Sequence, residues 1–177
     1  MGARYAAGAR NATGPRAVSR RISISAKLQD YLSGNQIDYS ISLHRPAFTA
    51  RDIAANDHTP LRHMTKSVVF IADGAYGMAL LPADMHIDAY ALGKAVGAKE
   101  LQLACETELR RLFPDVEVGA MPPFANLYGI PVYIDEHLAS RHEVAFNAGS
   151  HAEAIHMKVH DLIRLSRAQV IRFAAKD

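Results

Sequence analysis

The sequence contains no tryptophan, a single cysteine and only 7% aromatic residues. Cys105 alone cannot form an internal disulfide or a cysteine zinc cluster, which favours a reducing, cytoplasmic location. No apolar run approaches the ~20 residues that a bilayer-spanning helix needs, and no apolar signal segment follows the N-terminal arginines. These absences argue against a disulfide-stabilised secreted domain and predict no membrane partner.

Positive charge is concentrated near the N-terminus. Residues 1–29 hold six cations and no acid, whereas the rest of the chain holds 14 cations and 18 acids. A mildly acidic body does not favour bulk binding of duplex DNA, whose affinity comes from many phosphate contacts. We therefore expect no DNA partner, and we expect any contact with nucleic acid to be local.

Residues 1–21 are rich in Ala, Gly and Arg and show no sustained apolar period. Such a segment cannot bury enough surface to offset its ordering entropy, so we predict a disordered basic tail followed by one domain over 22–177. Two other interpretations of the tail stay open. It could be a basic arm that touches RNA phosphates, or an organelle-targeting peptide, whose composition is also Arg-rich and acid-free.

With 177 residues, of which 49% are hydrophobic, the chain can build one core. Ile24, Leu28 and Leu32 recur at helical spacing, residues 37–43 alternate as in a half-buried strand, and Asp73-Gly74 predicts a hairpin turn with a loop of three or four residues. Many strands interrupted by isolated helices indicate an α+β or mixed α/β domain. Further helices are expected after a Thr49 cap and over 88–96, 106–113, 135–139 and 161–165, and further strands over 67–72, 76–81, 101–104, 132–134, 143–147, 154–159 and 170–173.

The chain lacks the usual signatures of dinucleotide, P-loop, zincin and serine-hydrolase sites. His156 and His160 have the spacing of two metal ligands on a helix, but the alternation around them indicates a strand with exposed histidines. We therefore predict no metal and no cofactor. Cys105 is expected to be a small buried residue.

Three segments carry the informative chemistry. Lys66 opens an apolar strand, where a partly desolvated ammonium can bind an anion or polarise an ester, although a lone lysine at a strand end is usually solvated. Gly119-Ala120-Met121-Pro122-Pro123-Phe124 is a stiff loop that can form a wall of a ligand site or a tight crossover. Ala148-Gly149-Ser150 can offer backbone amides and a hydroxyl to a ligand, or simply turn a hairpin.

In this order, these segments resemble the YbaK/prolyl-tRNA-synthetase-associated editing domain over roughly residues 24–173. The resemblance implies a mixed α/β domain with a central, strongly curved sheet flanked by helices. It also implies trans-acting, metal-independent hydrolysis of mischarged aminoacyl-tRNA at the terminal ribose. The matching segments are Thr65-Lys66-Ser67-Val68-Val69-Phe70, Leu80-Leu81-Pro82-Ala83-Asp84, residues 92–98, Gly119 to Phe124, Val132-Tyr133-Ile134-Asp135 and Phe146-Asn147-Ala148-Gly149-Ser150.

The resemblance also implies roles for individual residues. The family's essential lysine corresponds to Lys66, its glycine–proline substrate loop to the segment from Gly119 to Phe124, and its Ala-Gly-Ser turn to residues 148–150. Ala125 stands where family members commonly have glycine, which restricts the loop, and the basic N-terminal extension is not part of the family pattern. The expected substrate-binding residues are Gly119, Met121, Pro122, Pro123, Phe124, Gly149 and Ser150.

The expected substrate is the acceptor end of an aminoacyl-tRNA that carries a small amino acid, such as alanine, serine, cysteine or proline. An aminoacyl-tRNA synthetase is a further candidate partner, and the sequence does not predict whether one is required. Lys66 would stabilise the ester, and the substrate's own ribose hydroxyl would help to position the nucleophile. A non-catalytic module that recruits tRNA or a synthetase, and an inert domain that forms oligomers, remain the alternatives. The sequence does not predict an oligomeric state.

Overall fold

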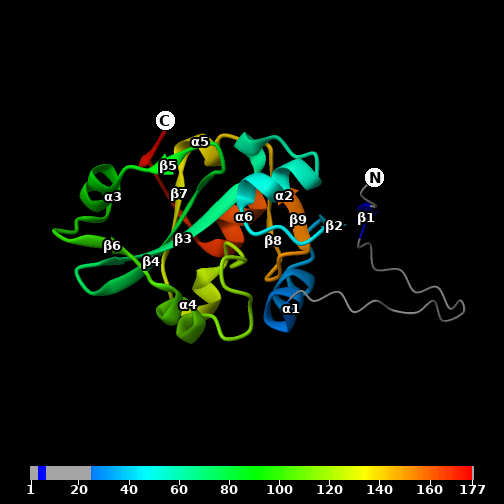
Figure 1. Ribbon diagram of the computed structural model, residues 1–177, viewed down its shortest axis with the longest axis horizontal. Helices are drawn as coiled ribbons and strands as arrows, with labels where there is room; N and C mark the ends of the chain where they lie inside the picture. The colour runs from blue at the N-terminus through cyan, green and yellow to red at the C-terminus, as the bar shows by residue number, and fades with distance from the viewer. Residues whose placement is uncertain (1–3, 7–24, 177) are drawn as a thin grey trace, which may run out of the picture.

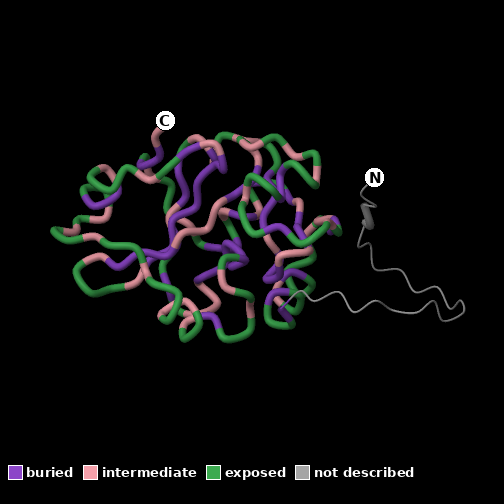
Figure 2. Tube along the Cα trace, viewed as in Figure 1, coloured by how far each residue is buried: buried purple, intermediate pink, exposed green. Residues whose placement is uncertain are grey.

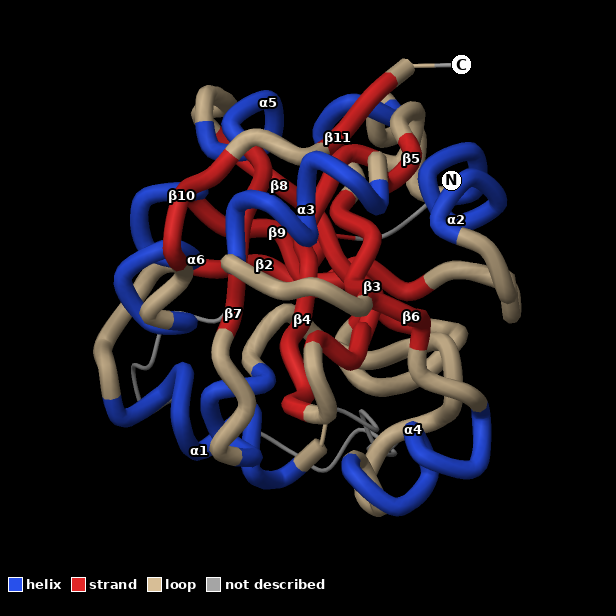
Figure 3. The backbone as a smooth tube through the Cα atoms, turned by 90° about the vertical axis from the view of Figure 1, so that its left-hand side faces the viewer, coloured by secondary structure: helices blue, strands red, loops and turns tan. Residues whose placement is uncertain are grey.

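The computed structural model describes residues 4–6 and 25–176. Strands occupy the centre of the molecule, and the helices lie around them (Figures 1 and 3). The helices are α1 (Ala26–Gly34), α2 (Ala50–Asn56), α3 (Ala89–Val96), α4 (Glu106–Leu112), α5 (Glu136–Ala139) and α6 (Val159–Ser166), with 3-10 turns η1 (Leu61–His63) and η2 (Ala125–Tyr128). The strands are β1 (Arg4–Ala6), β2 (Tyr39–Leu43), β3 (Thr65–Ala72), β4 (Ala75–Pro82), β5 (His86–Ile87), β6 (Leu101–Leu103), β7 (Val132–Asp135), β8 (Glu143–Asn147), β9 (Glu153–Lys158), β10 (Gln169–Ile171) and β11 (Ala174–Ala175).

A five-stranded mixed sheet has the order β10-β7-β4-β3-β6. Strand β3 runs antiparallel to β4 and β6, whereas β7 is parallel to β4 and β10. The predicted hairpin is present, but its loop is only the two residues Asp73 and Gly74, both with positive φ. Two positive φ values give a turn whose twist matches that of the flanking strands, which explains why the loop is shorter than predicted.

This five-stranded sheet is mixed, as the sequence analysis predicts, but the described residues form two further sheets beside it. A second, antiparallel sheet has the order β1-β2-β9-β8, and β5 and β11 form a small third sheet. The two large sheets meet where an isolated parallel bridge joins Met64 to Ala145, so the beginning of β3 lies beside β8. Local patterns predicted the individual strands but contain no information on which strands pair at this junction.

Strand β3 is the central element of the packing because it is covered on both faces. Val69 belongs to the largest apolar cluster, together with Phe124 and Phe146, whereas Phe70 belongs to a second cluster with Leu81. Buried segments accordingly run along the central strands, and exposed segments follow the loops and helix surfaces (Figure 2). The packed side chains on both faces therefore hold a polar residue of this strand in a fixed position.

Side-chain caps begin several helices, including the predicted cap at Thr49. Ser25 accepts a hydrogen bond from Leu28 N at the start of α1, and Thr49 accepts one from Asp52 N at the start of α2.

In the predicted tail, Arg4–Ala6 form a strand that pairs with β2, and the composition does not predict this strand. The rest of the predicted tail, residues 1–3 and 7–21, lies outside the described residues. Within residues 4–6 and 25–176, no helix has the length and apolar character that crossing a membrane requires.

Candidate functional site

A pocket of about 260 Å³ lies beside the first half of β3. Its walls come from four separate parts of the chain: the start of α2, the start of β3, the loop before η2 and the end of β8. The pocket therefore lies at the junction of the two large sheets. The lining residues are Thr49, Ala50, Thr65, Lys66, Ser67, Val68, Gly119, Met121 and Asn147.

One wall of the pocket is a strand edge. Ala104 N donates to Val69 O, so Val69 directs its backbone polar groups toward β6. Backbone direction alternates along an antiparallel strand, so Ser67 presents its N–H and C=O at the same edge. Strand β6 pairs only with residues 70–72 of β3, and the pocket occupies the edge beyond it.

Lys66 lies at this pocket, together with Gly119 and Met121 of the predicted substrate loop. It shares its face of β3 with Val68 and Phe70, and its side chain is half-buried. The Lys66 ammonium donates to the carbonyl oxygen of Met85, just beyond β4. This contact holds the cationic group within the folded body, next to the predicted loop.

The predicted loop divides into a pocket wall and a buried support. Gly119 has a φ of 86°, a conformation that favours glycine, and its N–H lies 3.3 Å from Met121 Sδ. Pro122 and Pro123 are buried and lie outside the lining of the pocket. Phe124 is completely buried and makes edge-to-face contacts with Tyr31 and Phe146. The structure thus places Phe124 in the core and not on the pocket surface.

Gly149 and Ser150 lie away from the Lys66 pocket. Gly149 has a φ of 102°, and a β-carbon there would be 3.2 Å from Val116 Cγ1. Ser150 is buried and donates to Glu153 Oε2 at 3.3 Å. Ser150 contributes to a larger surface hollow of about 730 Å³, whose other lining residues include Phe48, Arg110, Glu117 and His151.

His151 connects the walls of the two hollows, and the sequence analysis did not single it out. Its Nδ1 lies 3.1 Å from Ala47 O and its Nε2 lies 2.9 Å from Val118 O. The His151 N–H donates to Glu117 Oε2 at 2.8 Å, and the ring packs on the exposed ring of Phe48. His151 therefore joins the segment before α2 to the segment before Gly119. No local sequence pattern reports contacts between residues so far apart.

A cluster of Ser42, Asp57 and His156 lies elsewhere, on β2, β9 and the end of α2. His156 Nε2 is 2.9 Å from Asp57 Oδ2 and 3.1 Å from Ser42 Oγ. A Ser-His-Asp triad needs the acid and the serine on opposite ring nitrogens, so this arrangement is not a triad. The cluster corrects the prediction of exposed strand histidines, because the His156 side chain is only 18% exposed.

Electrostatics explain why the Asp57 carboxylate is tolerated there. Burial raises the pKa of Asp57, but hydrogen bonds from His156, Ser42 and Thr59 outweigh burial and hold that pKa well below its usual value. His160 lies in the first turn of α6 and not on the strand, and its side chain is 84% exposed, as the sequence analysis expects. In the part of the chain that the structure describes, no three His, Cys, Asp or Glu side chains are arranged to hold a metal ion.

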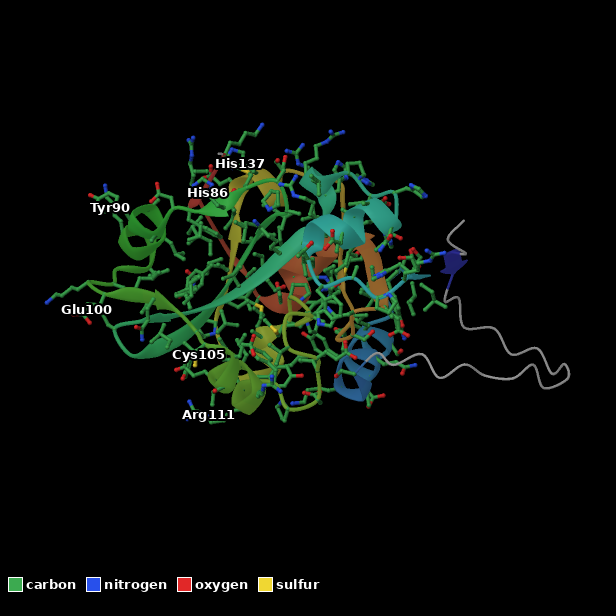
Figure 4. All side chains as sticks on the ribbon, in the orientation of Figure 1. His86, Tyr90, Glu100, Cys105, Arg111 and His137 are labelled. Carbon is green, nitrogen blue, oxygen red and sulfur yellow. The ribbon has the colours of Figure 1, made fainter. Side chains whose placement is uncertain are left out.

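Cys105 is exposed at the start of α4, so the prediction of a buried cysteine is wrong (Figure 4). The Cys105 N–H donates to Glu108 Oε2 at 2.8 Å, and Arg111 stands on the same helix. Cys105 is the N-cap residue of α4, at the helix start that the sequence predicts, and only its exposure differs from the prediction.

The comparisons with known proteins agree with this architecture. The profile of the aminoacyl-tRNA editing domain matches residues 44–165, more than half of the chain, so the chain belongs to this family. The match includes β3, the loop before η2 and β8, which together form most of the pocket. The family is the YbaK-like editing family that the motifs predicted, and that prediction is confirmed.

Individual relatives are more distant. The multifunctional Ser/Thr-tRNA deacylase ProXp-y of Escherichia coli K12 is 26% identical over 147 residues, which cover 80% of this chain and 87% of that protein. The hypothetical protein APE2540 has the same fold, with a TM-score of 0.77, 19% identity and coverage of 84% and 99% of the two chains. A candidate trans-editing enzyme for prolyl tRNA synthetase has a TM-score of 0.74 and 24% identity, with coverage of 90% and 99%. The mixed α+β single domain that the sequence predicts is thereby confirmed.

Proposed function

We propose that this protein is a trans-editing hydrolase that removes a small amino acid from mischarged aminoacyl-tRNA. The observation that carries this proposal is the shared pocket of Lys66, Gly119 and Met121, in a chain that belongs to the aminoacyl-tRNA editing domain family. A relative named as a tRNA deacylase supports the same reaction class. The proposed substrate of this protein is the acceptor end of an aminoacyl-tRNA, and a synthetase is a further candidate partner.

The proposed reaction is hydrolysis of an ester. A water oxygen bonds to the carbonyl carbon, the bond from that carbon to the ribose oxygen breaks, and the ribose oxygen takes up a proton. Negative charge develops first on the carbonyl oxygen and then on the ribose oxygen, so a preorganised cation beside them lowers the barrier. The Lys66 ammonium fills this role by exchanging the Met85 carbonyl for the ester oxygen. The neighbouring ribose hydroxyl of the substrate orients the water.

Size selection follows from the pocket walls. One methylene changes binding by only ~1–3 kcal/mol, so a synthetase needs a second site that sorts small cargo from large. Met121 and Gly119 line the pocket of about 260 Å³ in which we place the amino acid, and they are proposed to limit the size of its side chain. Buried Pro122 and Pro123 stiffen the segment behind that wall. Gly149 and Ser150 are proposed to support the loop: Gly149 O accepts from Glu117 N at 2.9 Å.

The decisive experiment compares Lys66→Ala with the wild type on a panel of mischarged tRNAs. Loss of one preorganised donor costs ~2.7–4 kcal/mol of transition-state stabilisation, so deacylation should slow by ~100-fold or more. Lys94→Ala is the matched control, because Lys94 is exposed on α3 and far in sequence from the pocket residues. EDTA should leave the wild-type rate unchanged.

A non-catalytic module that binds tRNA or a synthetase is the alternative on the same fold. It predicts that no mischarged tRNA is deacylated faster than in buffer, while tRNA binding persists in both variants. Wild-type turnover by a correctly folded Lys66→Ala protein would contradict the catalytic role of this lysine. Circular dichroism melting curves of both variants establish that they are folded.

A further inference from the structure

Both ring nitrogens of His151 face backbone carbonyl oxygens. Nδ1 lies 3.1 Å from Ala47 O, and Nε2 lies 2.9 Å from Val118 O. A carbonyl oxygen can only accept a hydrogen bond, so each nitrogen must carry a proton for both bonds to form. A neutral imidazole has one N–H and one acceptor nitrogen, so it satisfies only one of the two carbonyls. The hydrogen-bond pattern therefore fits the imidazolium form of His151.

The two carbonyls belong to segments that lead into different walls of the Lys66 pocket. Thr49, which lines the pocket at the start of α2, is two residues beyond the first carbonyl. Gly119, which lines the pocket from the loop before η2, directly follows the second. A β-carbon on Gly119 would lie 3.5 Å from His151 Cε1, the carbon between the two ring nitrogens. The ring therefore lies behind the wall at Gly119 and joins it to the wall at Thr49.

Three further contacts fix His151 without using its ring protons. Ala47 N–H donates to His151 O at 2.9 Å, and His151 N–H donates to Glu117 Oε2 at 2.8 Å. The ring of Phe48 packs on the imidazole with 4.8 Å between the ring centroids. A carboxylate bound to the same residue and an aromatic face on its ring both favour a cation. These contacts hold the ring beside both carbonyls.

Neighbouring charges come from the elements packed against His151. They include both signs and a further imidazole, so their effects on the His151 ring oppose one another. The two carbonyl acceptors therefore decide which form of the ring the fold favours. The neighbouring groups among the described residues are Arg110 on α4, Glu117 in the loop that follows α4, His44 and Arg45 in the segment before α2, and Glu153 at the start of β9.

We propose that His151 is a positioning residue whose ring carries two protons and ties the segment before α2 to the segment before Gly119. This inference rests on the proposed deacylase function, because the tie places the pocket walls around the ester. Loss of one proton turns a ring nitrogen into an acceptor that faces a carbonyl oxygen, and one half of the tie is lost. Histidine ordinarily changes charge between pH 5 and 8, so the tie should be complete at the acidic end of this range.

The kinetic test compares wild type with His151→Gln and His160→Gln from pH 5.5 to 8.5, on the best substrate of the mischarged tRNA panel. Gln offers an amide donor but no titratable ring. His160→Gln is the matched control, because the His160 side chain is 84% exposed on α6. Wild type should exceed His151→Gln in kcat/KM by about tenfold or more at pH 5.5 and by less than about threefold at pH 8.5. The ratio at each pH removes the pH dependence of ester hydrolysis itself, and it should stay near one for the control.

Two readouts do not depend on activity. Long-range proton–nitrogen NMR spectra of wild type distinguish a ring with two protons from either neutral tautomer. The ring of His151 should keep both protons to a higher pH than the exposed ring of His160. Because the folded state then binds this proton more tightly than the unfolded state, the stability that it adds is lost as pH rises. Wild type should melt about 2–4 °C or more above His151→Gln at pH 5.5, and this difference should shrink toward pH 8.5.

The outcomes separate this inference from the proposed function. A His151 ring that loses its second proton no later than His160, or a kcat/KM ratio that does not change with pH, overturns the two-proton tie and leaves the deacylase standing. An equal pH-dependent loss in His160→Gln also overturns it. If His151→Gln does not fold, the wild-type spectra alone decide. Failure of wild type to deacylate any mischarged tRNA rejects the proposed function, and with it the kinetic role of His151.

Discussion

Gly119 and Gly74 adopt the same φ of 86° in different surroundings. A β-carbon at Gly119 would lie 3.5 Å from His151 Cε1, whereas one at Gly74 would meet nothing within 4 Å. Left-handed backbone costs an L-residue ~1–2 kcal/mol, so Gly119→Ala and Gly74→Ala should lose similar stability. Only Gly119→Ala displaces a pocket wall, so it alone should lower kcat/KM for deacylation, by about tenfold or more. Urea unfolding and deacylation kinetics measure the two effects.

Gly74 makes this comparison informative because it separates backbone strain from pocket geometry. It lies in the β3–β4 turn, outside the pocket lining. Equal kinetic loss in both variants would show that general destabilisation, and not the pocket wall, limits the reaction.

The lowered pKa of Asp57 predicts that this carboxylate makes an acid-sensitive contribution to the free energy of unfolding. Its pKa lies below the ordinary value of 3.8 in the folded state, so the contribution is present above pH ~4 and is lost as pH falls further. Asp57→Asn removes the charge that His156 faces and should cost about 1–3 kcal/mol at pH 7. The difference from wild type should shrink below pH 4. Urea unfolding from pH 2.5 to 7 measures it, and a difference that does not depend on pH would contradict the assignment.

At the scale of single residues, the sequence predicted site residues where they belong to a recognisable motif. Lys66, Gly119 and Met121 were predicted from the sequence and line one pocket, although their roles stay predictions. Phe124 was predicted to touch cargo and lies in the core, because an apolar residue in a motif has the same sequence signature in either place. His151 and Asn147 gain their positions only through contacts between distant segments.

At the scale of elements, Asp135 joins the end of β7 to the C-terminal strands. It is completely buried, and its Oδ2 accepts from both Phe173 N and Ala174 N at 2.7 Å. Its Oδ1 accepts from His137 N at 2.9 Å and so caps α5. One carboxylate therefore fixes the start of a helix and the strand that follows β10.

Asp135→Asn should destabilise the protein, because an amide has one acceptor oxygen in place of two. At least one buried N–H loses its partner, at a cost of about 1–3 kcal/mol. Urea unfolding gives the loss, and faster hydrogen exchange at Phe173 and Ala174 localises it. Asp30→Asn, on the exposed face of α1, is the control and should change stability by less than about 0.5 kcal/mol. Equal effects of the two substitutions would mean that Asp135 contributes nothing specific.

Element types were more predictable than their assembly. Ser25, Thr49 and Asp88 accept hydrogen bonds at the helix starts, a local rule that a few neighbouring residues determine. The division into two large sheets depends on pairings such as β2 with β9, more than a hundred residues apart. Alternation along a strand reports which faces are buried but not which strand lies beside it.

At the scale of the whole molecule, the basic N-terminal segment predicts a salt-dependent contribution to tRNA binding. Changing Arg10, Arg16, Arg20 and Arg21 to Gln removes charge and keeps the residues that form β1. If the arm contacts phosphates, the slope of log K against log salt should flatten by roughly 0.7–0.9 for each lost contact. Fluorescence titration with tRNA between 50 and 200 mM salt measures the slope. An unchanged slope would mean that the arm makes no phosphate contact.

The walls of the Lys66 pocket come from four separate segments of the chain, and this has a consequence for biosynthesis. Its walls extend from Thr49 to Asn147, and the last of them forms only when β8 docks against the beginning of β3. A nascent chain on the ribosome that ends before β8 carries the lysine but has no enclosed place for an acyl group. The proposed deacylation activity should therefore arise late and abruptly during translation, once the second sheet has closed onto the first.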